Sequence, residues 1–274
     1  MNDLRDDLAA APLGHATEYP DTYDPAQLFT VPRVDTRETI GIGAALPFTG
    51  ADVWTAYEHT WLDAKGKPRV AIVSFAVPID SRNIVESKSV KLYLGSFAQS
   101  RFNDSVEVVR AIERDLSAAT ISDVRVMLVP QADARIAGLD GDSLDDIDVA
   151  IDRYEVDAAT LRTEGHFADE VLRTDLFRSV CPVTGQPDYA SLSIGYRGPR
   201  VDRASLLRYL VSYRRHAGFH EHCVERMFVD LVARCHCEAL TINARFTRRG
   251  GLDINPFRTN AGVPVPRNVR TPRQ

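Results

Sequence analysis

Hydrophobic residues along the chain follow two periods, and together they predict a mixed α+β protein. Apolar residues that recur every three or four positions are typical of helices, and alternating or continuous apolar runs bounded by turn residues are typical of strands. We predict strands over 69–79, 124–130, 148–156, 172–180, 190–196 and 240–247. We predict helices over 86–101, 104–118, 202–215 and 221–234, the third of which begins after a capping residue, Asp202.

The predicted elements recur in the same order, which indicates a tandem duplication. Tyr93-Leu94-Gly95-Ser96-Phe97 resembles Tyr209-Leu210-Val211-Ser212-Tyr213, which lies 116 positions later, and Phe102-Asn103-Asp104 resembles Phe219-His220-Glu221 at an offset of 117. We therefore predict an N-terminal arm over 1–50 that wraps the surface, a first half over 51–160 and a second half over 161–274. The second half alone contains cysteine, so we expect it to be the catalytic half.

Composition excludes several function classes. The 274 residues carry a net charge of -5, with 44% hydrophobic and 26% charged residues, which is typical of a globular protein in water. The acidic balance argues against direct nucleic-acid binding, and the chain has no apolar run of the roughly 20 residues that a membrane helix needs. The four cysteines are not spread like a disulfide framework, which favours a reducing, cytoplasmic location.

The segment from Ser179 to Asp188 carries the strongest chemical signal. Cys181 follows a predicted strand, a turn with two prolines and one glycine comes next, and Asp188 begins the next apolar run. Such a turn can hold a thiol and a carboxyl toward one cavity, as a nucleophile and a proton donor require. The alternative is a buried thiol beside an ordinary turn.

Three further segments could bind a ligand. His220 and Glu221 open a predicted helix, where a carboxylate could accept N–H donors from a guanine-like ring. The segment 86–93 opens another helix and, with the two lysines Lys88 and Lys91 and two serines, suits a phosphate, as does the pair Arg248-Arg249 before Gly250-Gly251. Each of these segments could instead be an ordinary helix start or a solvated turn.

The sequence lacks the spacing of common metal sites and of common nucleotide-binding motifs. Cys235-His236-Cys237, Cys223, His220 and His222 lack the spacing of common zinc motifs, so we expect no metal. The chain has no GxGxxG fingerprint and no Walker loop. A nucleotide would therefore bind in another way.

Taken in this order, the four segments resemble the long form of the 7-cyano-7-deazaguanine reductases, the NADPH-dependent nitrile reductases of queuosine biosynthesis, a tRNA modification pathway. The resemblance runs from Val53 to the C-terminus and is most specific over 86–93, 181–188, 219–226 and 248–256. It implies a tandem tunnelling fold, in which two antiparallel-sheet halves each carry two helices, and it implies a homodimer. The small-molecule substrate would be a deazapurine nitrile, and the cofactor NADPH.

The resemblance also implies residue roles. Cys181 would form a covalent thioimide with the nitrile, and Asp188 would donate the proton. The implied substrate contacts are Val85, Glu86, Ser87, His220 and Glu221. The implied NADPH contacts are Ser87, Lys88, Arg249 and Gly250. A metal-dependent purine or pterin cyclohydrolase of the same fold and a non-enzymatic purine-binding protein are the alternative functions.

Overall fold

The structure is a computed structural model that describes residue 12 and residues 18–274. In it, the alternating run predicted as a strand over 69–79 forms β3 (Pro68–Pro78). β3 pairs antiparallel with β5 (Arg125–Val129) and lies beside β2 (Thr49–Leu62). These strands belong to the first of two compact units, which comprises residues up to 36, 52–135 and 248–254. The second unit comprises 37–51, 136–247 and 255–274.

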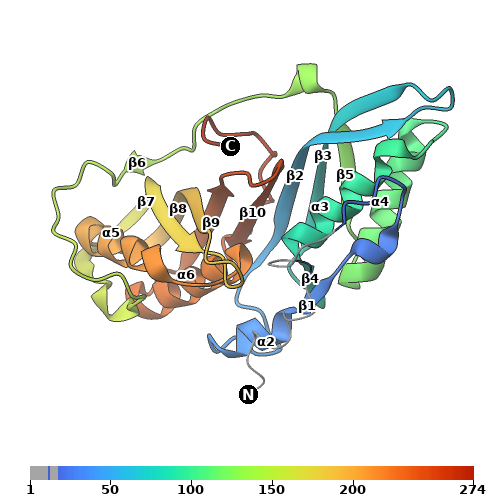
Figure 1. The fold of residues 1–274 in the computed structure, drawn as a ribbon. Coiled ribbons are helices and arrows are strands. Elements are labelled where there is room, and N and C mark those ends of the chain that lie inside the picture. The colour runs from blue at the N-terminus through green and yellow to red at the C-terminus, as the bar shows by residue number, and fades with distance from the viewer. Residues whose placement is uncertain (1–11, 13–17) are drawn as a thin grey trace. The chain divides into compact units, whose positions relative to one another are not determined.

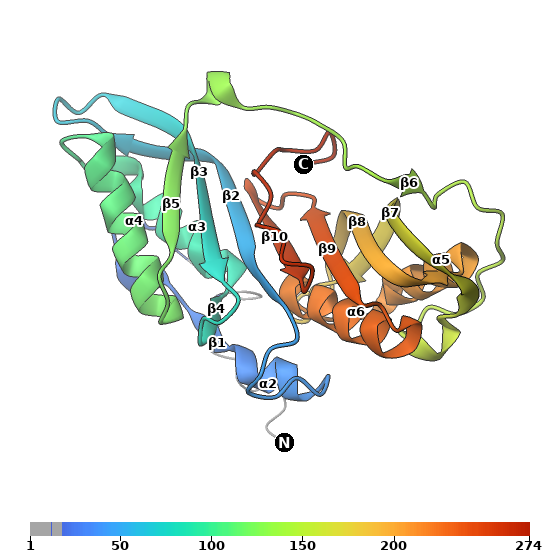
Figure 2. The ribbon, with the colours of Figure 1, turned by 180° about the vertical axis from the view of Figure 1, so that it is seen from behind.

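Two helices cover the sheet of the first unit, α3 (Ser87–Gly95) and α4 (Ser105–Thr120) (Figures 1 and 2). α4 buries Val108, Ala111, Ile112 and Leu116, whose helical spacing places them on one face. They join a core in which the rings of Trp54 and Phe75 stack with centroids 5.5 Å apart. Burial of this apolar stripe fixes the helices on the sheet.

The second unit repeats the arrangement. Its strands follow the order β10 (Leu252–Thr259, of which 255–259 belong to this unit), β9 (Ala239–Phe246), β8 (Pro187–Val201), β7 (Thr163–Val180) and β6 (Asp142–Ser143). All of these pairs are antiparallel except β6 with β7. The helices α5 (Arg203–Ser212) and α6 (His220–Cys235) pack on this sheet (Figures 1 and 2). The predicted α+β class, with two helices in each half, is confirmed.

The shorter elements complete the chain. They are η1 (Pro25–Gln27), β1 (Thr30–Pro32), α2 (Arg33–Glu38), β4 (Asn83–Val85), η2 (Ser96–Gln99), η3 (Gln131–Asp133), η4 (Ala158–Thr160) and η5 (Tyr213–Arg215). Among the described residues, no helix is long and apolar enough to cross a membrane.

Equivalent polar contacts in the two units support the predicted duplication. The hydroxyl of Tyr93 on α3 donates to Asp115 on α4 at 2.7 Å, and that of Tyr209 on α5 donates to Asp230 on α6 at 2.6 Å. α4 and α6 also end alike, since the residue after each, Ile121 or His236, is left-handed with φ of 54°.

These contacts also correct one sequence match. Asp115 and Asp230 differ by 115 positions, as do the N-cap residues Asp104 and Phe219. The offset of 117 between Phe102-Asn103-Asp104 and Phe219-His220-Glu221 therefore does not align equivalent positions of the two helices.

One predicted strand is wrong. Residues 148–156 contain no strand. Their apolar residues are interrupted by Asp148, Asp152 and Glu155, and no neighbouring strand pairs with them. The closing segment after Gly251 instead forms β10. Residues 1–11 and 13–17 of the predicted arm lie outside the described residues, and within its described part Arg33 and Arg37 are buried.

Candidate active site

The hairpin between β7 and β8 positions Cys181. The backbone N–H of Cys181 donates to the carbonyl of Gln186 at 2.9 Å, and the N–H of Gly185 donates back to the carbonyl of Cys181 at 3.0 Å. Gly185 closes this turn with φ of 68°, a left-handed conformation that glycine adopts without strain. Cys181 is consequently held directly after β7 and is 3% exposed.

The register of the hairpin places Asp188 opposite Ser179, and Cys181 comes two residues after Ser179. Because side chains alternate along a strand, the directly paired Ser179 and Asp188 lie on one face of the sheet. Cys181 comes one residue after the end of β7, at the start of the turn that leads back to Asp188. The predicted pairing of thiol and carboxyl is therefore compatible with the fold.

His220 extends this group from the first turn of α6. Its Nε2 lies 3.3 Å from Oδ2 of Asp188, and both side chains are buried. The imidazole stacks on the ring of Phe246, with centroids 3.8 Å apart and planes 4° from parallel. Its buried Nδ1 has no hydrogen-bond partner among the described residues. The contacts of His220 thus fix one carboxylate oxygen of Asp188 and the plane of its own ring.

The other three thiols are poor nucleophiles. Burial raises the pKa of Cys223 to about 12, of Cys235 to about 11 and of Cys237 to about 12. Cys223 lies close to the candidate site, since it contacts Ser179 and its pKa is raised further by Asp188 and Glu221. A thiol with so high a pKa is almost entirely protonated at neutral pH, and the thiolate is the reactive form.

In the first unit, Glu86 caps α3. One oxygen of its carboxylate accepts from the N–H of Lys88 at 2.6 Å and the other from the N–H of Ser89 at 2.8 Å, while the hydroxyl of Ser87 lies at 3.2 Å. Glu86 is 1% exposed, and burial raises its pKa in spite of these donors. The predicted substrate contact therefore also has a structural role as a helix cap.

The turn at Gly250 brings the predicted cofactor residues of the first unit to α3. Arg249 and Leu252 exchange both backbone hydrogen bonds, and Gly250 and Gly251 between them have φ of 58° and 86°. Positive φ at both central residues defines a type I′ turn and explains the glycines. A Cβ on Gly250 would lie 2.5 Å from Nζ of Lys91, so the ammonium of Lys91 occupies that space.

Lys91 belongs to the segment predicted to suit a phosphate. It follows Lys88 by three positions on α3, so both side chains lie on neighbouring parts of one helix face. Its ammonium lies beside the turn that carries Arg249 and Gly250.

The predicted residues divide between the two units. Cys181, Asp188, His220 and Glu221 lie in the second unit, and the six residues from Val85 to Lys88, Arg249 and Gly250 lie in the first. Their assignment to substrate and cofactor stays a prediction. Among residues 12 and 18–274, no three His, Cys, Asp or Glu side chains gather as a metal site would require.

A cavity of about 300 Å³ in the second unit lies elsewhere. Arg173, Asp175, Ser191 and Arg273 are among its lining residues. Ser191 is three residues after Asp188 on β8, so their side chains point to opposite faces of the sheet. We therefore do not assign this cavity to the candidate active site.

Comparisons with known proteins identify relatives over nearly the whole chain. Residues 19–128 match the family model described as nitrile reductase, 7-cyano-7-deazaguanine-reductase N-term, and residues 187–263 match the model described as QueF-like protein. The chain is 55% identical over 270 residues to the NADPH-dependent 7-cyano-7-deazaguanine reductase of Burkholderia multivorans, covering 96% of this chain and 98% of that protein. It is 53% identical to the protein of the same name from Paraburkholderia phymatum, with the same coverage.

One solved structure, the apo form of the archaeosine synthase QueF-Like, matches 37% of this chain and 99% of its own. The identity is 18% and the TM-score 0.31, which is too low to support a conclusion.

Proposed function

Because this chain belongs to the family of NADPH-dependent 7-cyano-7-deazaguanine reductases, we propose that it reduces the nitrile of 7-cyano-7-deazaguanine to 7-aminomethyl-7-deazaguanine. The chain is an oxidoreductase that uses NADPH. The observation that supports a thioimide mechanism is that a single hairpin turn, closed by the hydrogen bond from the N–H of Cys181 to the carbonyl of Gln186, connects Cys181 to Asp188. Supply of the product to queuosine biosynthesis, and a cytoplasmic location, are further parts of the proposal.

The proposed first step joins the substrate to the chain. The thiolate of Cys181 adds to the nitrile carbon, one bond of the C≡N group breaks, and Asp188 gives a proton to the nitrogen, which leaves a thioimide. The contact from His220 holds Asp188 in place for this transfer. The thioimide accepts hydride more readily than the nitrile does. After the first reduction, the C–S bond breaks, Cys181 leaves as thiolate and an imine remains.

The residues present fit NADPH. A phosphate suits the cations Lys88, Lys91 and Arg249, and the absence of a Cβ on Gly250 lets the turn and Lys91 come together. We propose that Ser87, Lys88, Arg249 and Gly250 hold the cofactor. When bound, NADPH supplies one hydride for the thioimide and, in a second molecule, one for the imine.

Substrate recognition is proposed for the acidic residues at the helix starts. Glu221 is 5% exposed at the start of α6, where a carboxylate can accept the exocyclic amine and ring N–H donors of the deazaguanine. Val85, Glu86, Ser87 and His220 are proposed as the other contacts. A buried carboxylate discriminates against rings that lack these donors, since it would be left unpaired.

An absorbance assay tests the reaction. With protein, NADPH and 7-cyano-7-deazaguanine, the NADPH absorbance should fall by two equivalents for each nitrile consumed, and it should not fall when the nitrile is omitted. Addition of a chelator should leave the rate unchanged. A reaction that needs added metal and no NADPH would instead indicate a cyclohydrolase, and no reaction at all would indicate a binding protein.

We also propose a homodimer. In the described part of the chain, β6 pairs with β7 only at Leu172 and Arg173, so most of the outer edge of β7 has no partner strand. Phe167, Val171 and Leu176 on this strand are exposed. An open edge of this length favours pairing with a second copy. Sedimentation should give twice the monomer mass, and an active monomer would refute the proposal.

A further inference from the structure

α6 carries a second buried glutamate one turn after Glu221. Glu225 is 2% exposed and follows Glu221 by four residues, so both carboxylates lie on the same face of the helix, with Cβ atoms about 6 Å apart. Like charges at this spacing disfavour each other. A buried pair of glutamates therefore requires compensating positive charge nearby.

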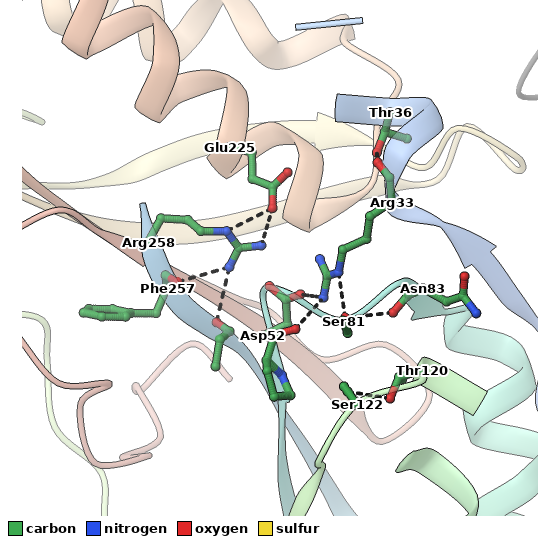
Figure 3. Close-up of polar contacts among 12 residues, drawn as sticks. Arg33, Thr36, Asp52, Ser81, Asn83, Thr120, Ser122, Glu225, Phe257 and Arg258 are labelled. Carbon is green, nitrogen blue, oxygen red and sulfur yellow. Dashed lines mark hydrogen bonds and ion pairs between the residues drawn. The ribbon is translucent and has the colours of Figure 1, made fainter. Parts of the chain in front are cut away.

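Two buried arginines of the second unit supply that charge. Nε and Nη2 of Arg258 donate to Oε1 of Glu225 at 3.1 and 2.9 Å (Figure 3). Nε of Arg37, on α2, donates to Oε2 at 3.0 Å, and its Nη2 donates to Oε1 at 2.7 Å. We refer to these residues as the Arg37–Glu225–Arg258 triad.

Arg258 is itself fixed by its surroundings. It is 0% exposed, and its Nη1 donates to the carbonyls of Phe257 at 3.1 Å and Ala51 at 3.3 Å (Figure 3). The guanidinium lies 5.5 Å from the ring centroid of Phe48. Gly50 is needed here because a Cβ on it would lie 2.0 Å from the carbonyl oxygen of Phe257. Backbone contacts therefore hold the guanidinium against α6.

The triad fixes the helix turn that follows Glu221. Arg37 and Arg258 together donate four hydrogen bonds to the carboxylate of Glu225, and Glu221 lies one turn earlier on the same face of α6. We propose that the Arg37–Glu225–Arg258 triad is a positioning set that holds the first two turns of α6 and so places the carboxylate of Glu221 for the substrate ring. This inference rests on the proposed substrate role of Glu221.

Fold stability alone does not require the triad. Replacement of a buried ion triad by apolar residues of similar volume is often neutral or stabilising, whereas removal of one partner leaves an unpaired charge. The informative variant therefore replaces all three residues together, by Arg37→Met, Glu225→Leu and Arg258→Met. It removes the charges and keeps the packed volume.

The matched control removes a second buried ion pair that begins from the same short helix. Nη2 of Arg33 lies 2.5 Å from Oδ2 of Asp52, and its Nε donates to Ser81 at 2.8 Å (Figure 3). Arg33 lies one turn before Arg37 on α2 and belongs to the first unit. The control variant is Arg33→Met with Asp52→Asn.

Calorimetric titration of each folded variant with 7-cyano-7-deazaguanine, and separately with NADPH, tests the proposal. We expect the triad variant to bind the nitrile at least ten-fold more weakly while NADPH binds within two-fold of the unsubstituted chain. The control variant should change neither affinity more than two-fold. Unchanged nitrile binding by the triad variant, or equal weakening of both ligands, would overturn the proposal.

Single variants cover the case in which the triple variant does not fold. Glu225→Gln keeps the shape of the side chain and should also weaken nitrile binding, whereas Arg37→Lys keeps the charge and should retain most of it. The opposite ranking would overturn the proposal. Failure of the unsubstituted chain to bind the nitrile would refute the proposed function. Normal nitrile binding by both the unsubstituted chain and the triad variant would refute only the role of the triad.

Discussion

Replacing Cys181 by alanine tests the proposed nucleophile against the other thiols of the chain. Cys223 is the strongest competitor, since it lies beside Ser179 and the carboxylates of Asp188 and Glu221. Its pKa, raised by burial from 9.0 to about 12, leaves about one thiolate in 10⁵ molecules at pH 7, against about one in 100 for an unperturbed thiol. Addition to the nitrile requires the thiolate, so Cys223 should react roughly 10³ times more slowly than an ordinary cysteine.

Intact-protein mass spectrometry, with the nitrile present and NADPH omitted, provides the assay. The unsubstituted chain should gain the mass of one nitrile base. Cys181→Ala should gain none over the same period, and it should also lose turnover with NADPH. Cys223→Ala is the matched control and should keep both adduct and turnover. An adduct on Cys181→Ala that forms within ten-fold of the original rate would refute the assignment of the nucleophile.

The remaining predictions concern the proton donor, the helix cap, the cofactor and acid stability. Asp188→Asn should slow nitrile reduction about 10²-fold with the fold retained, and near-normal turnover would remove Asp188 from the mechanism. Glu86→Gln should lower the free energy of unfolding by about 1 kcal/mol through loss of a cap bond, measured by urea denaturation, besides weakening nitrile binding. NADPH should be preferred over NADH, and replacement of Lys88 and Arg249 by methionine should reduce that preference; equal use of both cofactors by the unsubstituted chain would contradict the assignment. Burial lowers the pKa of His59 from 6.5 to about 4, so the folded chain keeps this ring neutral while the unfolded chain binds a proton below pH 6.5. Stability should therefore fall between pH 6.5 and pH 4 by up to about 3 kcal/mol from this residue, and His59→Leu should reduce that fall in urea denaturation at the two pH values.

Most of the regular elements could be predicted because their burial pattern is local. α4 shows its apolar face through Val108, Ile112 and Leu116, and β3 contains a mainly apolar run over 71–75 in which every residue is buried. The failed strand at 148–156 has only short apolar runs between acidic residues. Strand pairing depends on distant partners, and the sequence of one segment does not specify whether a partner exists.

The site was predictable only where its chemistry is local. Cys181 and Asp188 are connected by a single turn, which the two prolines and the glycine between them indicate. The pairing of Arg37 with Glu225 joins residues separated by 188 positions, and no local pattern indicates it. Arginines are mostly exposed, so composition argues against a buried position such as that of Arg258. Only the tertiary structure identifies such a residue.

The two halves differ at the start of their second helix. In the first unit, Asp104 caps α4 by accepting from the N–H of Glu107 at 2.8 Å. The equivalent residue of the second unit is Phe219, which offers no side-chain bond to α6. Loss of such a cap costs about 1 kcal/mol in other proteins.

The first turn of α6 instead carries His220 and Glu221, and its next turn carries Glu225, which Arg37 and Arg258 hold. Both halves keep the tyrosine–aspartate contact between their helices, so the scaffold has been retained. Tertiary ion pairs to Glu225 thus fix the position of α6, whereas a local side-chain cap closes the start of α4. This exchange leaves the first residues of α6 available to contact Asp188 and, as proposed, the substrate.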